Sequence, residues 1–234
     1  MLAEATGLWA RLLLDLGKRQ QAEQLAAKLE QWPENAHLLL ARGRIRLALG
    51  QPEKALADFL KAIDFAPKYP ADEWRHLERA NAYQALKQDD KSLVELSSAV
   101  ELWPKKWDTW VWRGNFHRDR QQWTEAIADY SKALELNLKF QPGWQARGTA
   151  QYRAGDWEGA IVSLTKSTEL PKGGDAYDWF YLGMSQWKLD QKEKARQSYD
   201  RAVQWMEKHA AQREELRPLR AEAAELLGLG KKKD

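Results

Sequence analysis

Cysteine is absent from this chain of 234 residues. Without a thiol, the chain has no disulfide, no thiolate metal site and no cysteine nucleophile. The lack of cysteine does not distinguish an oxidising from a reducing compartment. Long apolar runs are also missing, because no stretch approaches the roughly 20 apolar residues that a membrane helix needs. The formal net charge of +3 is too small to indicate nucleic-acid binding by itself. We therefore expect neither a membrane nor a nucleic acid as a partner.

Motifs for catalysis, cofactors and metals are missing too. The four histidines form no pair at helical ligand spacing and have no acid cluster beside them, so we expect no metal site. His117 is better interpreted as a partly buried histidine with a hydrogen-bond partner. Gly173-Gly174 precedes no Lys-Ser or Lys-Thr, which excludes a phosphate loop there. We expect a protein that is not an enzyme and has no cofactor.

The N-terminus and the composition indicate a soluble, folded protein. Hydrophobic residues make up 44% and charged residues 30% of the chain, proportions typical of globular proteins. Residues 1–17 carry Glu4 before their apolar positions and have no basic segment, so they predict a helix rather than a signal peptide. We expect a cytoplasmic location.

Residues 107–140 show the pattern that organises the rest of the chain. Residues of one helix face recur at i, i+4 and i+7 on two successive segments, which predicts two short helices joined by a polar turn at 119–122. Gly114 inside the first helix costs about 1 kcal/mol relative to alanine. The compensation we expect is a close helix contact, with the large Tyr130 filling the gap beside it. The residues at this spacing are Trp110, Gly114 and His117, then Ala126, Tyr130 and Ala133.

The same pattern recurs along the chain with a period near 34 residues. The small residue of each second helix is Ala22, Ala55, Ser92, Ala126, Ala160 and Ala195. The spacings are 33, 37, 34, 34 and 35 residues, as in repeats with two helices per unit. The position in the first helix that Gly114 occupies holds Gly43, Ala80, Gly114, Gly148 and Gly183. The matching aromatic or leucine is Phe59, Leu96, Tyr130, Leu164 and Tyr199.

These residues resemble the tetratricopeptide repeat (TPR) family, in its bacterial arrays. The resemblance implies an all-α fold, a right-handed α-solenoid of about six helix–turn–helix units with a C-terminal capping helix. We predict one solenoid over residues 1–234, with a capping helix at 210–230 and a basic tail at 231–234. The predicted repeats span residues 3–35, 36–72, 73–106, 107–140, 141–175 and 176–209.

Oppositely charged residues recur 16 positions apart within the repeats. The pairs are Arg42 and Asp58, Arg79 and Glu95, and Arg113 and Asp129. We predict salt bridges between the two helices of a repeat. If such pairs are exposed, each contributes only about 0 to 1 kcal/mol.

The resemblance places function on the inner side of the first helices, where TPR arrays form a concave groove. Trp, Tyr and Arg are common interface anchors, and an Asn side chain can donate to and accept from a peptide backbone. The lysine and asparagine set with which some TPR proteins clamp a C-terminal carboxylate is absent. The candidate peptide-binding residues are Arg44, Trp74, Leu77, Asn81, Gln84, Asn115, Arg118, Gln145, Tyr152, Arg153, Tyr177, Phe180 and Trp187.

The function that we predict is a non-catalytic scaffold that binds a peptide or protein segment in this groove. An alternative is an oligomerisation or docking module, since the repeats also resemble those that follow kinase or β-propeller domains in large bacterial proteins. A third hypothesis, RNA binding by a related helical repeat, is disfavoured by the apolar groove positions and the low net charge.

Overall fold

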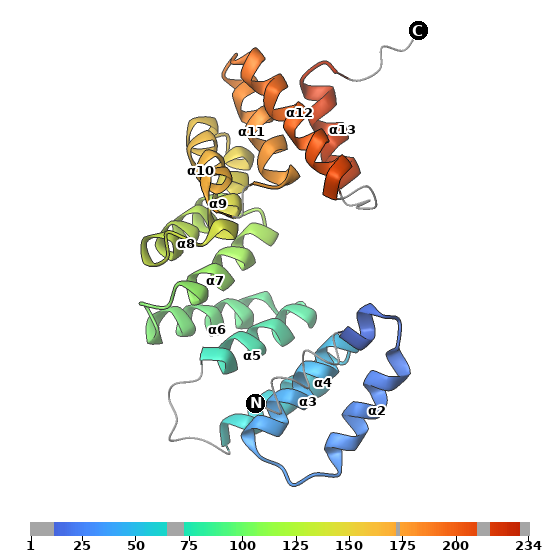
Figure 1. Cartoon of the computed structure of the whole chain (residues 1–234). Helices are drawn as coiled ribbons and strands as arrows, with labels where there is room; N and C mark the ends of the chain where they lie inside the picture. Colours follow the sequence, from blue (N-terminus) through green and yellow to red (C-terminus); the bar gives the residue numbers. More distant parts are fainter. Residues whose placement is uncertain (1–11, 65–72, 172–173, 210–215, 230–234) are drawn as a thin grey trace. The chain divides into compact units, whose positions relative to one another are not determined.

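The computed structural model describes residues 12–64, 73–171, 174–209 and 216–229. The chain divides into two compact units, Met1–Pro104 (unit 1) and Lys105–Asp234 (unit 2). Within the described residues every regular element is an α-helix (Figure 1), which confirms the all-α prediction. None of the described helices combines the length and apolar character that crossing a membrane requires.

Unit 1 contains helices α2 to α6 in its described part. Helix α2 (Arg19–Glu30) packs on α3 (Ala36–Ala48), and α3 forms a hairpin with α4 (Pro52–Asp64). Helix α5 (Glu73–Ala85) forms the next hairpin with α6 (Asp89–Leu102), and α4 contacts α5. Each hairpin therefore packs on the one before it, as in a stack of repeats.

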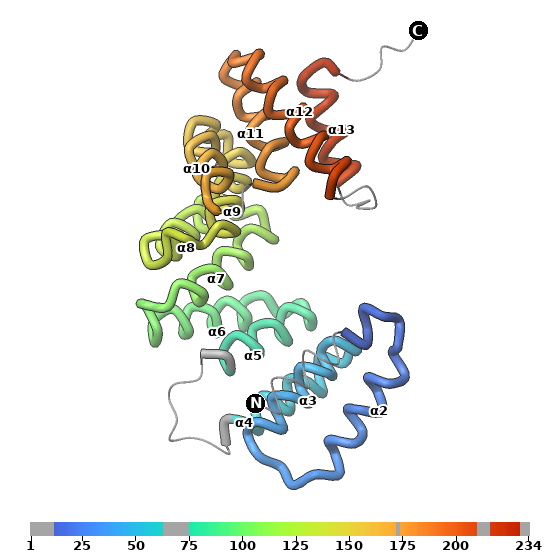
Figure 2. Tube along the Cα trace, viewed as in Figure 1, coloured from blue at the N-terminus to red at the C-terminus, as the bar shows by residue number. Residues whose placement is uncertain are grey.

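The described part of unit 2 contains three further hairpins and one terminal helix. Figure 2 shows the chain reversing direction between the two helices of each hairpin. The second helix of one hairpin packs on the first helix of the next, as α8 does on α9 and α10 on α11. The helices are α7 (Trp107–Asp119), α8 (Trp123–Leu136), α9 (Gln141–Ala154), α10 (Trp157–Glu169), α11 (Ala176–Lys188), α12 (Lys192–His209) and α13 (Leu216–Leu226).

The predicted contact between a small and a large residue recurs in both units. A Cβ atom added to Gly43 would lie 2.3 Å from Cε1 of Phe59, and one added to Gly114 would lie 2.8 Å from Cε1 of Tyr130. Separations this short are impossible unless the ring moves, so glycine at these two positions makes room for the large ring opposite it. The small residue of each second helix, from Ala22 to Ala195, is completely buried. The predicted contacts of Gly43 with Phe59 and of Gly114 with Tyr130 are therefore confirmed.

A left-handed residue closes each turn between the two helices of a repeat. In three repeats this residue is glycine, for example Gly155 with φ of 85°, but Gln121 takes the same place with φ of 58°. L-residues other than glycine pay an energetic cost in this conformation, so the geometry is imposed by the packing of the hairpin. The left-handed residues are Gly17, Gly50, Lys87, Gln121, Gly155 and Asp190.

The predicted salt bridges form, and one of them is more buried than expected. Arg42 donates to Asp58 with a shortest N–O distance of 2.7 Å, and both side chains are more than 90% buried. Arg46 also donates to Asp58, at 2.6 Å. The small contribution of exposed pairs therefore does not apply at this position. A buried charge that loses its partner is strongly destabilising. Arg79 with Glu95 and Arg113 with Asp129 also pair as predicted.

Candidate functional site

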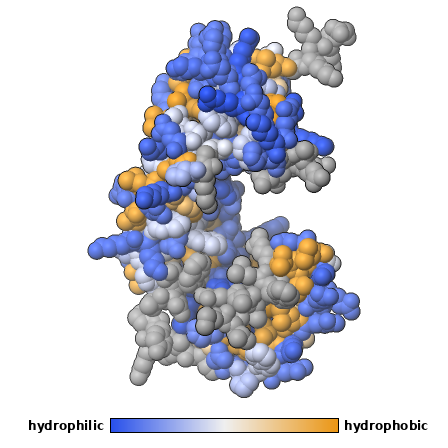
Figure 3. Space-filling view, in the orientation of Figure 1, coloured by the Kyte–Doolittle hydropathy of each residue, from blue (hydrophilic) through white to orange (hydrophobic). Residues whose placement is uncertain are grey.

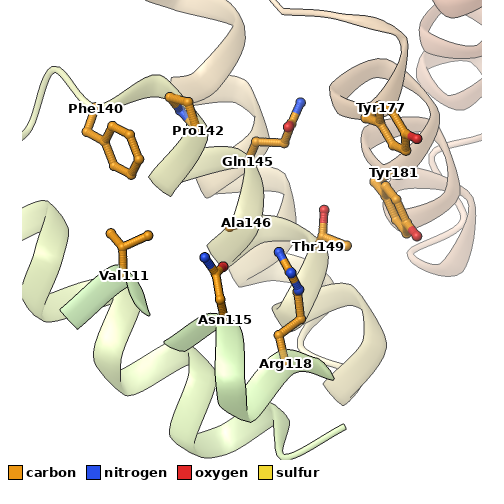
Figure 4. Close-up of a pocket in the computed structure, with 10 residues that line it drawn as sticks. All are labelled: Val111, Asn115, Arg118, Phe140, Pro142, Gln145, Ala146, Thr149, Tyr177 and Tyr181. Atoms are coloured by element: carbon orange, nitrogen blue, oxygen red, sulfur yellow. The ribbon is translucent and has the colours of Figure 1, made fainter. Parts of the chain in front are cut away.

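A pocket of about 410 Å³ lies among the first helices of the three repeats in unit 2. Figure 4 shows side chains from α7, α9 and α11 facing a common space. Its volume lies in the range of ligand sites, which is about 300 to 1,000 Å³. The lining residues are Val111, Asn115, Arg118, Phe140, Pro142, Gln145, Ala146, Thr149, Tyr177 and Tyr181.

Helical spacing explains why these residues share one pocket. Val111, Asn115 and Arg118 occur at i, i+4 and i+7 on α7, so their side chains project from one face. The four residues from α9, from Pro142 to Thr149, follow the same spacing. The stacking of hairpins then brings the matching faces of successive first helices to the same side of unit 2.

Asn115 offers hydrogen-bond donors to the pocket. Its Oδ1 atom accepts from the Tyr130 hydroxyl at 2.8 Å, so its amide NH₂ group is the part available to a ligand. Burial raises the pKa of Tyr130 to about 12, which keeps the hydroxyl protonated and therefore a donor at physiological pH. Because Tyr130 is completely buried, the orientation of Asn115 is set by the core of the repeat.

Gln145 offers the opposite hydrogen-bonding group. Its Nε2 atom donates to Oδ1 of Asp175 at 2.8 Å and to Oδ2 of Asp178 at 3.1 Å, which leaves its carbonyl oxygen as the acceptor for a ligand. Asp175 and Asp178 form the capping box that begins α11. Burial raises the pKa of Asp178 to about 6. The pocket therefore presents one fixed donor group and one fixed acceptor group.

The two ends of the pocket differ in chemistry. Val111 and Phe140 lie at one end in Figure 4, and Arg118, Tyr177 and Tyr181 lie at the other. Arg118 is 41% exposed and donates to its neighbour Asp119 at 2.8 Å, so its charge is largely balanced. A ligand therefore meets an apolar end, a middle that can pair with an amide, and a polar end with little net charge.

The structure brings together only part of the predicted site. The pocket contains Asn115, Arg118, Gln145 and Tyr177. Tyr152 and Arg153 also belong to unit 2, but they contact helix α13 rather than this pocket. Trp187 packs partly buried against the core of the last repeat, with the Lys192 ammonium 5.8 Å from its ring centre.

Four further predicted residues lie in unit 1. Arg44 donates to Oε1 of Glu78 at 2.6 Å, which links α3 to α5. Asn81 and Gln84 are partly buried on α5. Trp74 also belongs to α5, but its side chain lies outside the described residues.

Two predicted residues have a different role. Leu77 is 1% exposed and Phe180 is 0% exposed, so neither presents a surface to a ligand. Phe180 packs edge-on against Tyr199 with ring centres 5.6 Å apart. Their assignment to the groove is corrected, because both large apolar side chains are buried in the packing between helices.

The predicted list also omitted residues that line the pocket. Val111, Pro142 and Thr149 line the pocket but were not among the candidates, and neither were Ala146 and Tyr181. Ala146 lies four residues after Pro142 and Tyr181 four residues after the candidate Tyr177, so each shares a helix face with that residue. Applying helical spacing to the whole face would have found both. Phe140 precedes α9, so helical spacing does not indicate that it lines the pocket.

The histidine interpretation holds for His117, whose side chain is largely buried and whose Nδ1 atom lies 2.7 Å from Oε1 of Gln122. Among the residues that the structure describes, no group of three or more His, Asp or Glu side chains could hold a metal ion.

Comparisons with known proteins decide the family. A profile described as tetratricopeptide repeat matches residues 8–70 and 77–138, and a second with the same description matches residues 179–204. The chain belongs to the TPR family. No curated protein matches its sequence. The solved structures show the same fold at low sequence identity.

Three solved TPR structures illustrate this likeness. YrrB, described as a TPR protein with an unusual peptide-binding site, is 18% identical with a TM-score of 0.62, covering 85% of this chain and 96% of its own. The C-terminal part of a TPR protein from Cytophaga hutchinsonii is 16% identical with a TM-score of 0.70, covering 94% and 85%. MamA from Desulfovibrio magneticus is 16% identical with a TM-score of 0.63, covering 74% and 96%.

Proposed function

We propose that this TPR protein is a non-catalytic scaffold that binds an extended peptide segment in the pocket formed by α7, α9 and α11. The observation that carries the proposal is the pairing of a fixed donor group on Asn115 with a fixed acceptor on Gln145. A peptide backbone carries one carbonyl acceptor and one N–H donor per residue, apart from proline. The two amide side chains match that pattern.

The ends of the pocket suggest what side chains the segment carries. Val111 and Phe140 favour an apolar side chain, because burying one removes apolar surface of both partners from water. Arg118 and the two tyrosines favour a polar side chain or a backbone carbonyl at the other end. YrrB, which shares the fold, is described as having a peptide-binding site, and this supports a peptide as the ligand class.

The test uses peptides selected from a phage-displayed random library on the immobilised chain. A selected peptide is synthesised with a fluorophore, and its affinity is measured by fluorescence polarisation. We expect Thr149→Arg to weaken binding at least tenfold, because a long charged side chain fills the pocket. The matched control is Val162→Arg on α10, where the parent residue is 63% exposed and away from the pocket. The control is expected to bind like the parent.

Asn115→Ala provides a second, milder variant. It removes the donor to the peptide without adding bulk, and the lost hydrogen bond is worth about 1 kcal/mol, or roughly a fivefold loss of affinity. Circular dichroism establishes that each variant keeps its helices. Selected peptides that bind Thr149→Arg as tightly as the parent would show that the pocket is not the binding site.

A further inference from the structure

Helix α13 docks differently from every other helix of unit 2. Apart from their own hairpin partners, α9 and α11 each pack most on the second helix of the preceding repeat, α8 and α10. Helix α13 instead packs mainly on α11, a first helix, and contacts its predecessor α12 only slightly. The terminal helix therefore lies on the side of the first helices, the side on which the pocket also lies, and does not simply extend the stack.

The contacts of α13 have the character of a bound amphipathic helix. Leu216, Leu219, Ala223 and Leu227 are buried in the same core cluster as Phe180. The opposite part of the helix carries exposed charged residues, and the face of unit 2 visible in Figure 3 is mostly hydrophilic with small separate apolar patches. The apolar stripe therefore faces α11, as expected for a helix held by one face.

A carboxylate of α13 reaches across to α9. Glu222 accepts from Nη1 of Arg153 at 2.9 Å and from Nη2 at 3.1 Å, and Nη2 of Arg153 also donates to the hydroxyl of Tyr181 at 3.0 Å. Tyr181 lines the peptide pocket, so the docked helix adjoins it. A second cavity of about 520 Å³ remains between Tyr152 of α9 and Leu226 of α13, so the fit over α9 is incomplete.

We propose that the inner face of α9 and α11 is a binding surface for an amphipathic helix, and that α13 is its internal, exchangeable occupant. The partner is a helix of another protein with the pattern that α13 displays. It carries apolar residues at the spacing of Leu216, Leu219, Ala223 and Leu227, and a carboxylate at the place of Glu222 to meet Arg153. This surface adjoins the pocket at Tyr181, but its ligand is an amphipathic helix rather than an extended peptide.

Because α13 competes for the surface, it lowers the apparent affinity of the surface for a helix added in solution. A tethered segment acts at a high effective concentration, so it outcompetes a free helix of equal intrinsic affinity. The apparent affinity for a free helix falls in proportion to the fraction of molecules whose surface is vacant. Weakening α13 in the chain should therefore strengthen binding of the same helix added in solution.

The probe is a fluorescein-labelled synthetic peptide with the sequence of residues 216–229, LRPLRAEAAELLGL. In the full chain, Leu219→Asp puts a charge on the buried stripe, and we expect the peptide to bind this variant at least tenfold more tightly than the parent. Arg220→Asp introduces the same residue at an exposed position of α13 and should bind like the parent. A peptide that itself carries Leu219→Asp should not bind.

A second experiment does not depend on a destabilising variant. Because the chain has no cysteine, Arg153→Cys with Glu222→Cys creates the only two thiols, which a short bis-maleimide can join. The two cysteines replace the ion pair of Arg153 with Glu222, so the peptide binds this variant through its apolar stripe alone. We expect its affinity to fall at least tenfold on cross-linking, since the linker holds α13 in place. Equal affinity before and after cross-linking would overturn the proposal, as would equal affinity of the parent and a folded Leu219→Asp chain.

Measuring the molar mass by light scattering tests whether α13 of a second copy of the chain occupies the surface instead. If the parent is a dimer and Leu219→Asp is a monomer, α13 occupies the surface of a second copy, and the internal arrangement is refuted.

Discussion

The contact between Gly114 and Tyr130 offers a stringent test of the repeat packing. A Cβ atom at Gly114 would lie 2.8 Å from Cε1 and 3.0 Å from Cδ1 of Tyr130, whereas ordinary contacts begin at 3.4 Å. Gly114→Ala therefore forces the ring to move by about half an ångström. The ring is completely buried and its hydroxyl is tied to Asn115, so it has little freedom to do so.

Two opposing effects set the size of the change. Replacing a glycine within a helix by alanine stabilises it by about 1 kcal/mol. Overpacking a well-packed core costs about 1 to 3 kcal/mol. We therefore expect Gly114→Ala to lower the free energy of unfolding by about 0 to 2 kcal/mol.

In the preceding repeat, a larger first residue is matched by a smaller partner. Ala80 and Leu96 occupy the places of Gly114 and Tyr130, and both are completely buried. Tyr130→Leu should therefore make room for the new methyl group. In that background we expect Gly114→Ala to be neutral or stabilising, which corresponds to a coupling energy of about 1 to 2 kcal/mol between the two substitutions.

Urea unfolding followed by tryptophan fluorescence measures the four corners of this double-mutant cycle. The denaturant slope is compared first, because only chains with equal slopes can be compared by their midpoints. Additivity within about 0.5 kcal/mol would refute the packing argument, since residues in direct contact should couple.

The remaining predictions concern charge. Asp58→Asn should lower the free energy of unfolding by about 3 kcal/mol in urea titrations, because it leaves the buried Arg42 without its main partner; the exposed-pair variant Glu23→Gln should change it by less than about 1 kcal/mol. Equal effects of the two would contradict the burial argument. Asp178 has a pKa of about 6 in the folded chain and 3.8 as its ordinary value, so its contribution to stability is full below pH 3.8 and is lost as the pH rises through 6. About two pKa units correspond to about 3 kcal/mol, so the stability difference between the parent and Asp178→Asn should change by about that amount between pH 4 and 7. A difference independent of pH would show that the carboxyl is not shifted.

The repeat register could be predicted from sequence because it depends on residues close together in the chain. The small residues and their large partners, such as Gly43 and Phe59, occur 16 positions apart within one hairpin, and the structure places them in contact. The charge pairs follow the same spacing. Their burial did not follow from it, since Asp58 is enclosed by Arg42 and Arg46 together, and how closely they shield it depends on the folded packing.

The site was predicted less completely because exposure depends on the neighbouring repeat. The residue three places before Gly114, or before its counterpart in another repeat, is a pocket wall at Val111 and Gln145 but a core residue at Leu77 and Phe180. Pattern within one helix cannot distinguish these cases. The position of α13 was also beyond prediction, because its stripe of leucines suits several faces of the last repeat equally well.

The central claim, that a peptide binds among α7, α9 and α11, is tested most directly by mapping amide chemical shifts of the labelled full chain as a selected peptide is added. We predict that the largest changes fall on the face that carries Asn115, Gln145 and Thr149, and that the side-chain amides of Asn115 and Gln145 shift with them. Changes confined to α8, α10 and α12, with those two side chains unmoved, would contradict the account.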